Sequence, residues 1–363
     1  MKNKNMNVII AASGTGGHIY PGISVASELK SKGYNPVFFV SGNSASAEII
    51  KNSGFDYKSF AVSGMPRKFS LAFIKFMFMM KISFFKSLVL MIKLKPAFVI
   101  GTGGYIAVPA VFAGKMCFKK TFIHEQNTIP GVANRLLNAV ADMTFISFKE
   151  SEKYFKCKKK LFYSGYPVRK DITGISKEEA CSRLKLDKNI FTVLVFGGSL
   201  GAVKLNETAF DAMKVLSEKE KIQVLHITGD KSFAEIKEKT KDTGFYKVYG
   251  YMHDMGSVYA ASDIVICRAG AGTVFELKAL NKPAVLVPYP YATDNHQYFN
   301  AQEIKKENFI EVMEEKDLTV EKLLQTICKI RKNIPKAESF KAEKFPQEII
   351  AEEIIRIAAN EKI

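Results

Sequence analysis

Short apolar runs alternate with helical patterns along the whole chain, and this alternation restricts the fold more than any other feature. Apolar strands separated by helices are typical of parallel sheets whose two faces are covered by helices. The sequence therefore predicts an α/β protein with Rossmann-like, doubly wound parallel sheets. The expected strands fall near residues 7–12, 36–40, 57–60, 97–101, 121–123, 143–146, 161–163, 191–196, 222–227, 246–249, 263–267, 284–287 and 309–312.

Two domains are expected, because 363 residues exceed what one hydrophobic core usually supports. The passage 164–169 is rich in turn-forming residues and interrupts the alternation. We expect an N-terminal domain over residues 1–165 and a C-terminal domain over residues 166–345. A last helix, within residues 346–363, is assigned to the N-terminal domain. Two such domains facing each other would bind a ligand in a central cleft, at the carboxyl ends of both sheets.

The net charge of +17 is concentrated in the first half of the chain. Residues 1–165 contain 23 Lys and Arg against 7 Asp and Glu, whereas residues 166–363 contain 30 against 29. This asymmetry indicates an anionic partner for the first half, either a phospholipid surface or a nucleic acid. The five cysteines form no C-x-x-C pair and the N-terminus shows no signal-peptide pattern, which favours a reducing cytoplasm.

Residues 68–95 help to decide between these two partners. Phe, Met, Leu and Ile dominate the segment, and the spacing of Lys68, Lys75, Lys86 and Lys93 places them on one helical face. Four charges would each cost about 2.5–3.5 kcal/mol in the bilayer, so the segment is not expected to span it. We expect an amphipathic helix in the membrane interface, with its apolar side opposite the lysines. The alternative is an ordinary core helix with one wet stripe. A nucleic acid is disfavoured because the lysines interleave with Met and Leu rather than with exposed stacking aromatics.

The run from Ile264 to Ala301 is the strongest indication of chemistry. It joins a buried strand, the small-residue turn RAGAGT, a helix, a second strand and the polar loop of Asp294 to Gln297. Such a turn lets a phosphate approach backbone N–H groups at the helix start. Glu276 lies one turn into that helix and could accept both hydroxyls of a ribose; alternatively it complements the helix dipole. These features predict a nucleotide-sugar site. No D-x-D sequence is present, so neither a metal ion nor another cofactor is expected.

Glycine-rich turns follow strands in both halves of the chain. The first, GTGGHIYPG, departs from G-x-G-x-x-G, and no acidic residue follows the next strand, which disfavours a nicotinamide enzyme. His18 lies at a helix start, where the helix dipole favours the neutral imidazole, and is a candidate general base. A packing or capping role is the alternative. A second turn covers residues 101–105, HEQN ends another strand at residues 124–127, and GGSLGA carries Ser199, whose hydroxyl could donate to a phosphate.

Five ordered motifs resemble those of the MurG family, the bacterial undecaprenyldiphospho-muramoylpentapeptide N-acetylglucosaminyltransferases. They are GTGGHIYPG, GTGGYIAVP, HEQNTIPGVANRLL, GGSLGA and RAGAGTVFE with PYPYATDNHQYFNA, and they cover essentially the whole chain. The resemblance implies a GT-B fold and inverting transfer of N-acetylglucosamine from UDP-N-acetylglucosamine to lipid I, giving lipid II in peptidoglycan synthesis. It also implies a peripheral location at the cytoplasmic face of the bacterial cell membrane, through residues 68–95. Other cell-wall enzymes are conceivable partners.

The resemblance also implies roles for individual residues. The general base falls on His18 or Glu125, and acceptor contacts fall on Gly103, Gly104 and Tyr105. Contacts to the donor fall on Thr15, Gly16, Gly17, Asn127, Arg169, Ser199, Met252, Ala271, Gly272, Thr273, Val274, Phe275, Glu276 and Gln297.

The chain departs from the family pattern at three positions: Ser13 replaces a common glycine, Ala107 a frequent serine and His296 a frequent glutamine. Two rivals share the expected fold, a UDP-N-acetylglucosamine 2-epimerase and a diacylglycerol glycosyltransferase. An epimerase needs no lysine-bearing Phe/Met helix.

Overall fold

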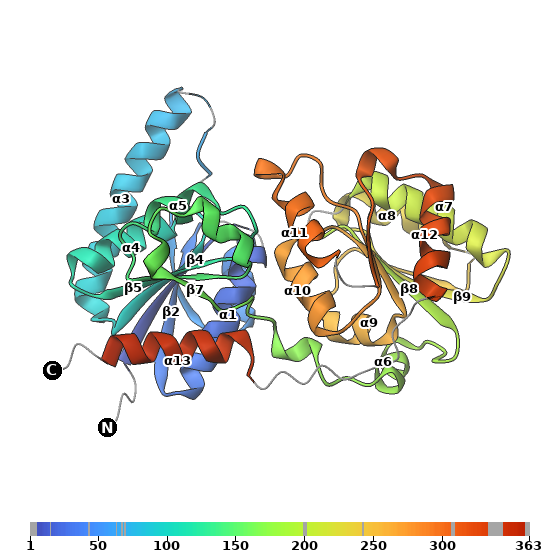
Figure 1. Cartoon of the computed structure of the whole chain (residues 1–363), viewed down its shortest axis with the longest axis horizontal. Helices are drawn as coiled ribbons and strands as arrows, with labels where there is room; N and C mark the ends of the chain where they lie inside the picture. Colours follow the sequence, from blue (N-terminus) through green and yellow to red (C-terminus); the bar gives the residue numbers. More distant parts are fainter. Residues whose placement is uncertain are drawn as a thin grey trace. The chain divides into compact units, whose positions relative to one another are not determined.

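The structure is a computed structural model, and it consists of two compact units, Met1–Val168 with Ala342–Ile363 and Arg169–Lys341. Each unit contains one parallel sheet with helices packed on it (Figure 1). The predicted α/β class, with two Rossmann-like parallel sheets, is confirmed. The structure describes residues 6–14, 16–42, 44–62, 64–66, 68, 70–198, 202–241, 243–305, 309–332 and 344–359.

The N-terminal unit contains a seven-stranded sheet with the order β3-β2-β1-β4-β5-β6-β7. Its strands are β1 (Met6–Ala12), β2 (Tyr34–Ser41), β3 (Asp56–Phe60), β4 (Phe98–Gly103), β5 (Lys120–Glu125), β6 (Met143–Ile146) and β7 (Leu161–Tyr163). Its helices are α1 (Gly16–Ser31), α2 (Ser44–Asn52), α3 (Leu71–Leu94), α4 (Ala107–Met116), α5 (Val132–Leu137) and α13 (Pro346–Ala359). The strand order reverses between β1 and β4, and ligands of such sheets bind at the carboxyl ends of the strands at that point.

Strand β1 shows why the sequence reads as a continuous apolar run. Val8 and Ile10 belong to the core on one face of the sheet, which α1 and α13 cover. Ile9 and Ala11 belong to the core on the other face. Because both faces are buried, residues 8–12 of the strand are all apolar, as is usual for parallel sheets.

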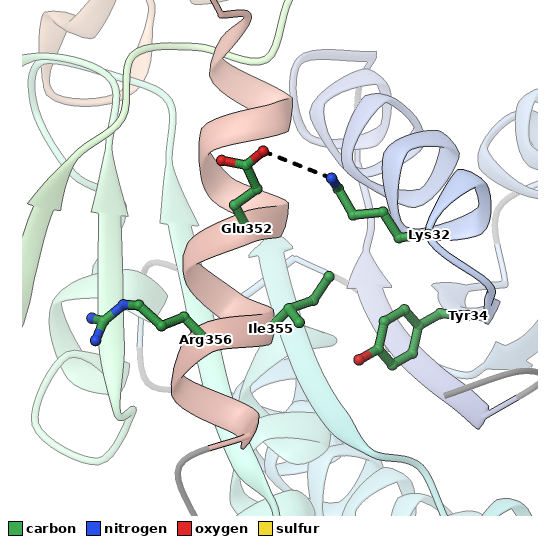
Figure 2. A pocket seen from close by; sticks show the side chains of 5 residues that line it. All are labelled: Lys32, Tyr34, Glu352, Ile355 and Arg356. Carbon is green, nitrogen blue, oxygen red and sulfur yellow. Dashed lines mark ion pairs between the residues drawn. The ribbon is translucent and has the colours of Figure 1, made fainter. Parts of the chain in front are cut away.

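Helix α13 is the C-terminal helix that the sequence predicts, and it packs into the core of the N-terminal unit. Ile350, Ala351 and Ile354 are fully buried in the core that contains β1 and α1. Figure 2 shows the solvent side of this contact, where Glu352 on α13 faces Lys32 after α1, with 3.8 Å between Oε1 and Nζ. The end of the chain therefore completes the core of the unit that begins it.

The C-terminal unit contains a six-stranded sheet with the order β10-β9-β8-β11-β12-β13. Its strands are β8 (Phe191–Phe196), β9 (Ile222–Ile227), β10 (Tyr246–Tyr249), β11 (Ile264–Cys267), β12 (Ala284–Leu286) and β13 (Ile310–Val312). Its helices are α6 (Lys177–Leu184), α7 (Val203–Ser217), α8 (Asp230–Lys239), α9 (Met255–Ala261), α10 (Ala271–Ala279), α11 (His296–Ile304) and α12 (Val320–Lys332). The strand order reverses between β8 and β11. The two turns predicted to bind phosphate, GGSLGA and RAGAGT, directly follow these two strands.

Candidate functional site

Three adjacent strands of the N-terminal unit, β1, β4 and β5, end in the predicted site residues. The two glycine turns after β1 and β4 are joined directly, because the Ser13 N–H donates to the Gly103 carbonyl at 3.2 Å. The Thr102 hydroxyl also donates to the His18 carbonyl at 2.9 Å. The turns therefore form one rigid surface at the carboxyl edge of the sheet.

Gly103 and Gly104 have a packing role in this surface. Both have positive φ angles, +132° and +74°. A Cβ at Gly103 would lie 2.3 Å from His18 Nδ1, and one at Gly104 would lie 2.2 Å from Ser13 Oγ. Only glycine allows this contact between the turns. The acceptor contacts expected of Gly103 and Gly104 remain predictions.

His18 is the third residue of α1 and is partly exposed. Its Nδ1 lies 2.9 Å from Oε1 of Gln126, which follows β5 and is buried. Gly16 and Gly17 open the same helix, and no acidic side chain occupies its first turn. Thr15 lies outside the described residues.

The side chain of Glu125, the other candidate base, is hydrogen-bonded within its own loop. It is buried, and Oε1 accepts from the Asn127 N–H at 2.9 Å and from the Asn127 side-chain amide at 3.4 Å. Oε2 accepts from the Gly131 N–H at 3.1 Å and from Asn134 Nδ2 at 2.8 Å. Four donors surround the carboxylate, and these bonds hold the loop that carries Asn127. The assignments of His18 and Glu125 as candidate bases stay predictions.

Tyr105 joins the second glycine turn to helix α3. Its ring makes an edge-on contact with Phe76, at 5.3 Å between centroids. Partial burial of the hydroxyl raises the pKa of Tyr105. The loop expected to contact the acceptor thus packs on the helix expected to contact the membrane.

Helix α3 is a single helix of 24 residues, whose N-terminal half extends away from the sheet of its unit (Figure 1). Ser83 and Ser87 are buried on the face that packs on α4. The opposite face is apolar and exposed; at its N-terminal end Leu71 is 86% and Phe78 62% exposed. We call this face the exposed apolar stripe, and it consists of Leu71, Ile74, Phe78, Ile82, Phe85, Val89 and Ile92.

Two expectations about this helix need correction. The alternative of a core helix with a wet stripe is wrong, because the stripe facing solvent is apolar. The lysines do not lie opposite the apolar side chains. Lys75, Lys86 and Lys93 lie by helical spacing along one border of the stripe and Lys81 along the other, because the remaining face packs on α4. Lys68 precedes the helix, which begins at Leu71, so its expected place on the helical face is wrong. Lys86 reaches back to the sheet, where its Nζ donates to the Ser59 carbonyl at 2.6 Å.

Among the residues that the structure describes, none of the helices combines the length and the apolarity that a membrane crossing requires. In the same ranges no three His, Cys, Asp or Glu side chains are grouped as metal ligands would be.

In the C-terminal unit, α10 begins with an uncapped N-terminus. Gly270 is its N-cap residue and has no side chain, so within the described part of the chain no side-chain cap bonds the first N–H groups, those of Ala271, Gly272 and Thr273. The Val274 N–H is already bonded to the Gly270 carbonyl at 3.0 Å, and its side chain is buried. An uncapped helix start is a ready site for an anion, and here the first three residues offer it.

Glu276 lies beyond the first turn of α10, so the alternative of an acid at the helix start is wrong. Tyr259, fully buried on α9, donates its hydroxyl to Glu276 Oε2 at 2.9 Å. Arg169 Nε lies 3.9 Å from Oε1, and 3.4 Å from Asp171. Burial raises the pKa of Glu276, and Arg169 and Tyr259 counteract that shift. Tyr259 holds one carboxylate oxygen, and the Glu276 side chain as a whole is 16% exposed.

Sequence reasoning missed Arg268, which organises the loops around this helix start. The buried guanidinium donates to the carbonyls of Val287 and Pro288, both at 3.2 Å, and pairs with Glu315. It also lies over the Tyr289 ring, 5.5 Å from the centroid. The only available signal was a charged residue directly after a buried strand.

The polar loop before α11 is fixed in a related way. Gln297 Oε1 accepts from the Tyr289 N–H at 2.9 Å, which joins the start of α11 to the segment that follows β12. Asp294 and Asn295 have φ angles of 51° and 54°. Asx residues tolerate this left-handed conformation better than most. His296 Nδ1 lies 2.8 Å from the Thr293 carbonyl.

The remaining predicted donor residues lie on both units. Met252 is partly buried in the loop between β10 and α9, and Phe275 is partly buried on α10. Asn127 follows β5 in the N-terminal unit. Ser199 lies outside the described residues.

Two family models match the chain, and together they cover most of it. Residues 8–146 match the glycosyltransferase family 28 N-terminal domain, and residues 192–354 match the glycosyltransferase family 28 C-terminal domain. A relative from Desulforamulus reducens is 36% identical over 343 residues, which is 92% of each chain. One from Thermoanaerobacter sp. (strain X514) is 38% identical over 89% of this chain and 90% of its own. Both relatives are named UDP-N-acetylglucosamine–N-acetylmuramyl-(pentapeptide) pyrophosphoryl-undecaprenol N-acetylglucosamine transferase.

The chain belongs to the MurG family of glycosyltransferases. The crystal structure of Acinetobacter baumannii MurG has the same fold, with a TM-score of 0.70 at 23% identity over 98% of this chain and 99% of that one. A UDP-N-acetylglucosamine 2-epimerase matches at a TM-score of 0.62 and 13% identity, over 99% of this chain and 98% of that one. These two structures show only that MurG and the epimerase share this fold; the family assignment rests on the relatives at 36% and 38% identity.

Proposed function

We propose that the protein transfers N-acetylglucosamine from UDP-N-acetylglucosamine to undecaprenyl-diphospho-N-acetylmuramoyl-pentapeptide (lipid I), with inversion, and so forms lipid II. One observation carries the proposal. Relatives named for this transfer match 89–92% of the chain at 36–38% identity. The exposed first turn of α10 and the held carboxylate of Glu276 are chemically suited to a nucleoside diphosphate sugar.

A transfer assay with labelled UDP-N-acetylglucosamine and a lipid I analogue tests the proposal. We expect the label to appear in the lipid-linked product only when both substrates are present. Incubation with the donor alone separates the rival of the same fold, because an epimerase would convert the donor without an acceptor. Transfer to diacylglycerol but not to the lipid I analogue would overturn the proposal.

The C-terminal unit would hold the donor. The N–H groups of Ala271, Gly272 and Thr273 would donate to the diphosphate oxygens, and Arg169 would add positive charge. The Glu276 carboxylate would accept hydrogen bonds from the ribose hydroxyls. Met252 would contact the uracil through its backbone, and Gln297 the sugar. Dipoles fixed before the reaction stabilise charge that develops on a leaving group, which is the task that UDP presents.

His18 would act as the general base. The muramyl hydroxyl oxygen attacks the anomeric carbon as His18 takes the hydroxyl proton, and the bond from that carbon to the UDP oxygen breaks with its electron pair leaving on UDP. A positioned base of this kind contributes about 10²–10⁴ in rate. We therefore expect His18→Ala to lower kcat by about that factor, with the affinity for UDP nearly unchanged. Undiminished turnover would exclude His18 as the base.

Helix α3 would hold the protein peripherally on the cytoplasmic face of the membrane. The acceptor named for the relatives carries an undecaprenol chain, and the exposed apolar stripe with its bordering lysines has the chemistry of an interfacial helix. Binding to anionic vesicles should exceed binding to an oligonucleotide at the same salt concentration. Preferential oligonucleotide binding would favour the nucleic-acid alternative.

A further inference from the structure

Gln126 is a buried amide at the centre of a hydrogen-bond network that includes His18. Its Nε2 lies 2.5 Å from the Thr102 carbonyl oxygen and 3.1 Å from the His124 carbonyl oxygen. Its Oε1 lies 2.9 Å from His18 Nδ1. The network joins the ends of β4 and β5 to the start of α1.

The chemistry of the partners fixes which end of the amide is which. A carbonyl oxygen can only accept, so the atom facing the Thr102 and His124 carbonyls must be the NH₂ group. The atom facing His18 is then the amide oxygen, which cannot donate. His18 Nδ1 must therefore carry a hydrogen, and a neutral His18 has its lone pair on Nε2.

The contacts of His124 support the same orientation of the Gln126 amide. Its Nδ1 lies 3.0 Å from Gln126 Nε2, and its Nε2 lies 3.4 Å from the Gly165 carbonyl and 3.3 Å from Ser147 Oγ. Burial, the largest cause, lowers the pKa of His124 to about 4, so the ring is neutral at pH 7. A neutral ring that donates from Nε2 can accept at Nδ1, which agrees with an amide NH₂ on that side.

We propose that Gln126 is a positioning residue, which holds His18 in the Nδ1–H tautomer and leaves Nε2 free to remove the acceptor proton. The inference rests on the proposed function, because His18 is the base there. After proton transfer the imidazolium still donates from Nδ1 to the Gln126 oxygen, so the contact persists through the reaction. Gly103 backs the same edge of the ring, where a Cβ would lie 2.3 Å from Nδ1.

The tautomer can be measured without any substrate. The chain has five histidines, and ¹⁵N spectra of the full-length protein labelled at histidine, with His18→Ala as the assignment control, report which nitrogen carries the proton. We expect a protonated Nδ1 and a bare Nε2 for His18 in the wild type. Gln126→Met, which keeps the length but removes the acceptor, should shift His18 toward the Nε2–H form. An unchanged tautomer in this variant would overturn the proposal.

Kinetics then separate positioning from a structural role. Gln126→Met should lower kcat about tenfold to a hundredfold, within the contribution of a general base, and leave KM for the donor within about twofold. In the His18→Ala background the same substitution should change kcat less than about twofold, because the two residues act as a unit. An equal loss in both backgrounds would show a structural role and overturn the proposal. Ser151→Ala is the matched control for the loss of a buried hydrogen-bonding side chain of the same unit. It deletes a hydroxyl that donates to the Phe148 carbonyl at 2.7 Å.

A second variant keeps the proposal testable if Gln126→Met does not fold. Gln126→Glu retains an oxygen for His18 Nδ1 and should preserve the Nδ1–H tautomer. Its negative charge beside the ring should move the acidic limb of the kcat/KM profile to higher pH. If the acidic limb of the profile did not move, the contact between residue 126 and His18 would be contradicted. If the tautomer follows Gln126 while His18→Ala remains fully active, the contact stands and the assignment of His18 as the base fails.

Discussion

At the scale of single residues, buried polar side chains in each unit hold the ones that would meet a ligand. Tyr259 anchors one oxygen of Glu276 from α9, and Gln126 contacts His18 from the end of β5. Arg268 fixes the loop that follows β12 through the Val287 and Pro288 carbonyls. Such supports lower the cost of ordering a ligand-binding group, since its rotamer is set before the ligand arrives.

Tyr259→Phe tests this support in the C-terminal unit. A hydrogen bond to a charged group contributes about 1.5–3 kcal/mol, and its loss would free the Glu276 carboxylate and raise its pKa further. We expect KM for UDP-N-acetylglucosamine to rise about tenfold with kcat nearly unchanged, as measured by initial rates at saturating acceptor.

Tyr246→Phe is the matched control, because it deletes another buried hydroxyl of the same unit, which lies 2.7 Å from His226 Nδ1. A similar rise of KM in both variants would mean that general destabilisation, not Glu276, is responsible.

At the scale of elements, helix α3 has three faces with different tasks. One packs on α4, one is the exposed apolar stripe, and lysines lie along the borders between them. The sequence predicted the helix and its amphipathic character from the spacing of the lysines. It misplaced the apolar side relative to them, because the pattern of one helix cannot show which face a neighbouring helix covers.

Phe78→Ser combined with Phe85→Ser tests the exposed apolar stripe. Burying one phenylalanine side chain away from water is favourable by about 1.5–3 kcal/mol. Partitioning of the double variant onto anionic vesicles should therefore fall at least about tenfold. Co-sedimentation with the vesicles measures this. Transfer to a soluble acceptor analogue should be unaffected, since both side chains face solvent.

Phe118→Ser provides the control, because Phe118 is 93% exposed in the same unit but lies outside the stripe. If it weakened vesicle binding as strongly as the double variant, the stripe would have no special role.

At the scale of the whole molecule, the alternation of strands and helices predicted both sheets, and the structure confirms them. The sequence assigned the last helix to the N-terminal domain. Strand order and the core residues that α13 contacts could not be predicted, since they depend on contacts between residues far apart in sequence. The turn after β11 was predicted from its small residues alone. The roles of Gln126 and Arg268 were not, because each depends on a partner from another element.

Two buried histidines, one in each unit, make the stability of the fold depend on pH. Burial lowers the pKa of His124 to about 4 and of His226 to about 3. Unfolded histidine has a pKa of about 6.5, so the unfolded chain binds these protons first. Both groups stabilise the fold fully above pH 6.5, and this stabilisation is lost as the pH falls toward 4 and then 3.

We expect the free energy of unfolding, measured with urea, to decrease between pH 6.5 and 4 by on the order of 3 kcal/mol for each unit. His226→Phe should be less stable at pH 7 but should show a shallower decrease for the C-terminal unit. A decrease of the same slope in this variant would contradict the role of His226.

Ile354→Ala tests the coupling between the two ends of the chain. Ile354 is fully buried in the core with β1, and such a truncation costs about 2–5 kcal/mol. The unfolding of the N-terminal unit should shift by this amount in urea. Ile92→Ala, at a 63% exposed position of the same unit, should shift it by less than about 0.5 kcal/mol.

The docking of α13 reverses the order in which the two units can mature on the ribosome. The N-terminal sheet is synthesised first, but its core lacks Ile350, Ala351 and Ile354 until those residues of α13 have been translated. The C-terminal sheet, whose last strand ends at Val312, has all its strands before then. The half that emerges first must therefore wait, with part of its apolar surface uncovered, while the half that emerges second already has all its strands.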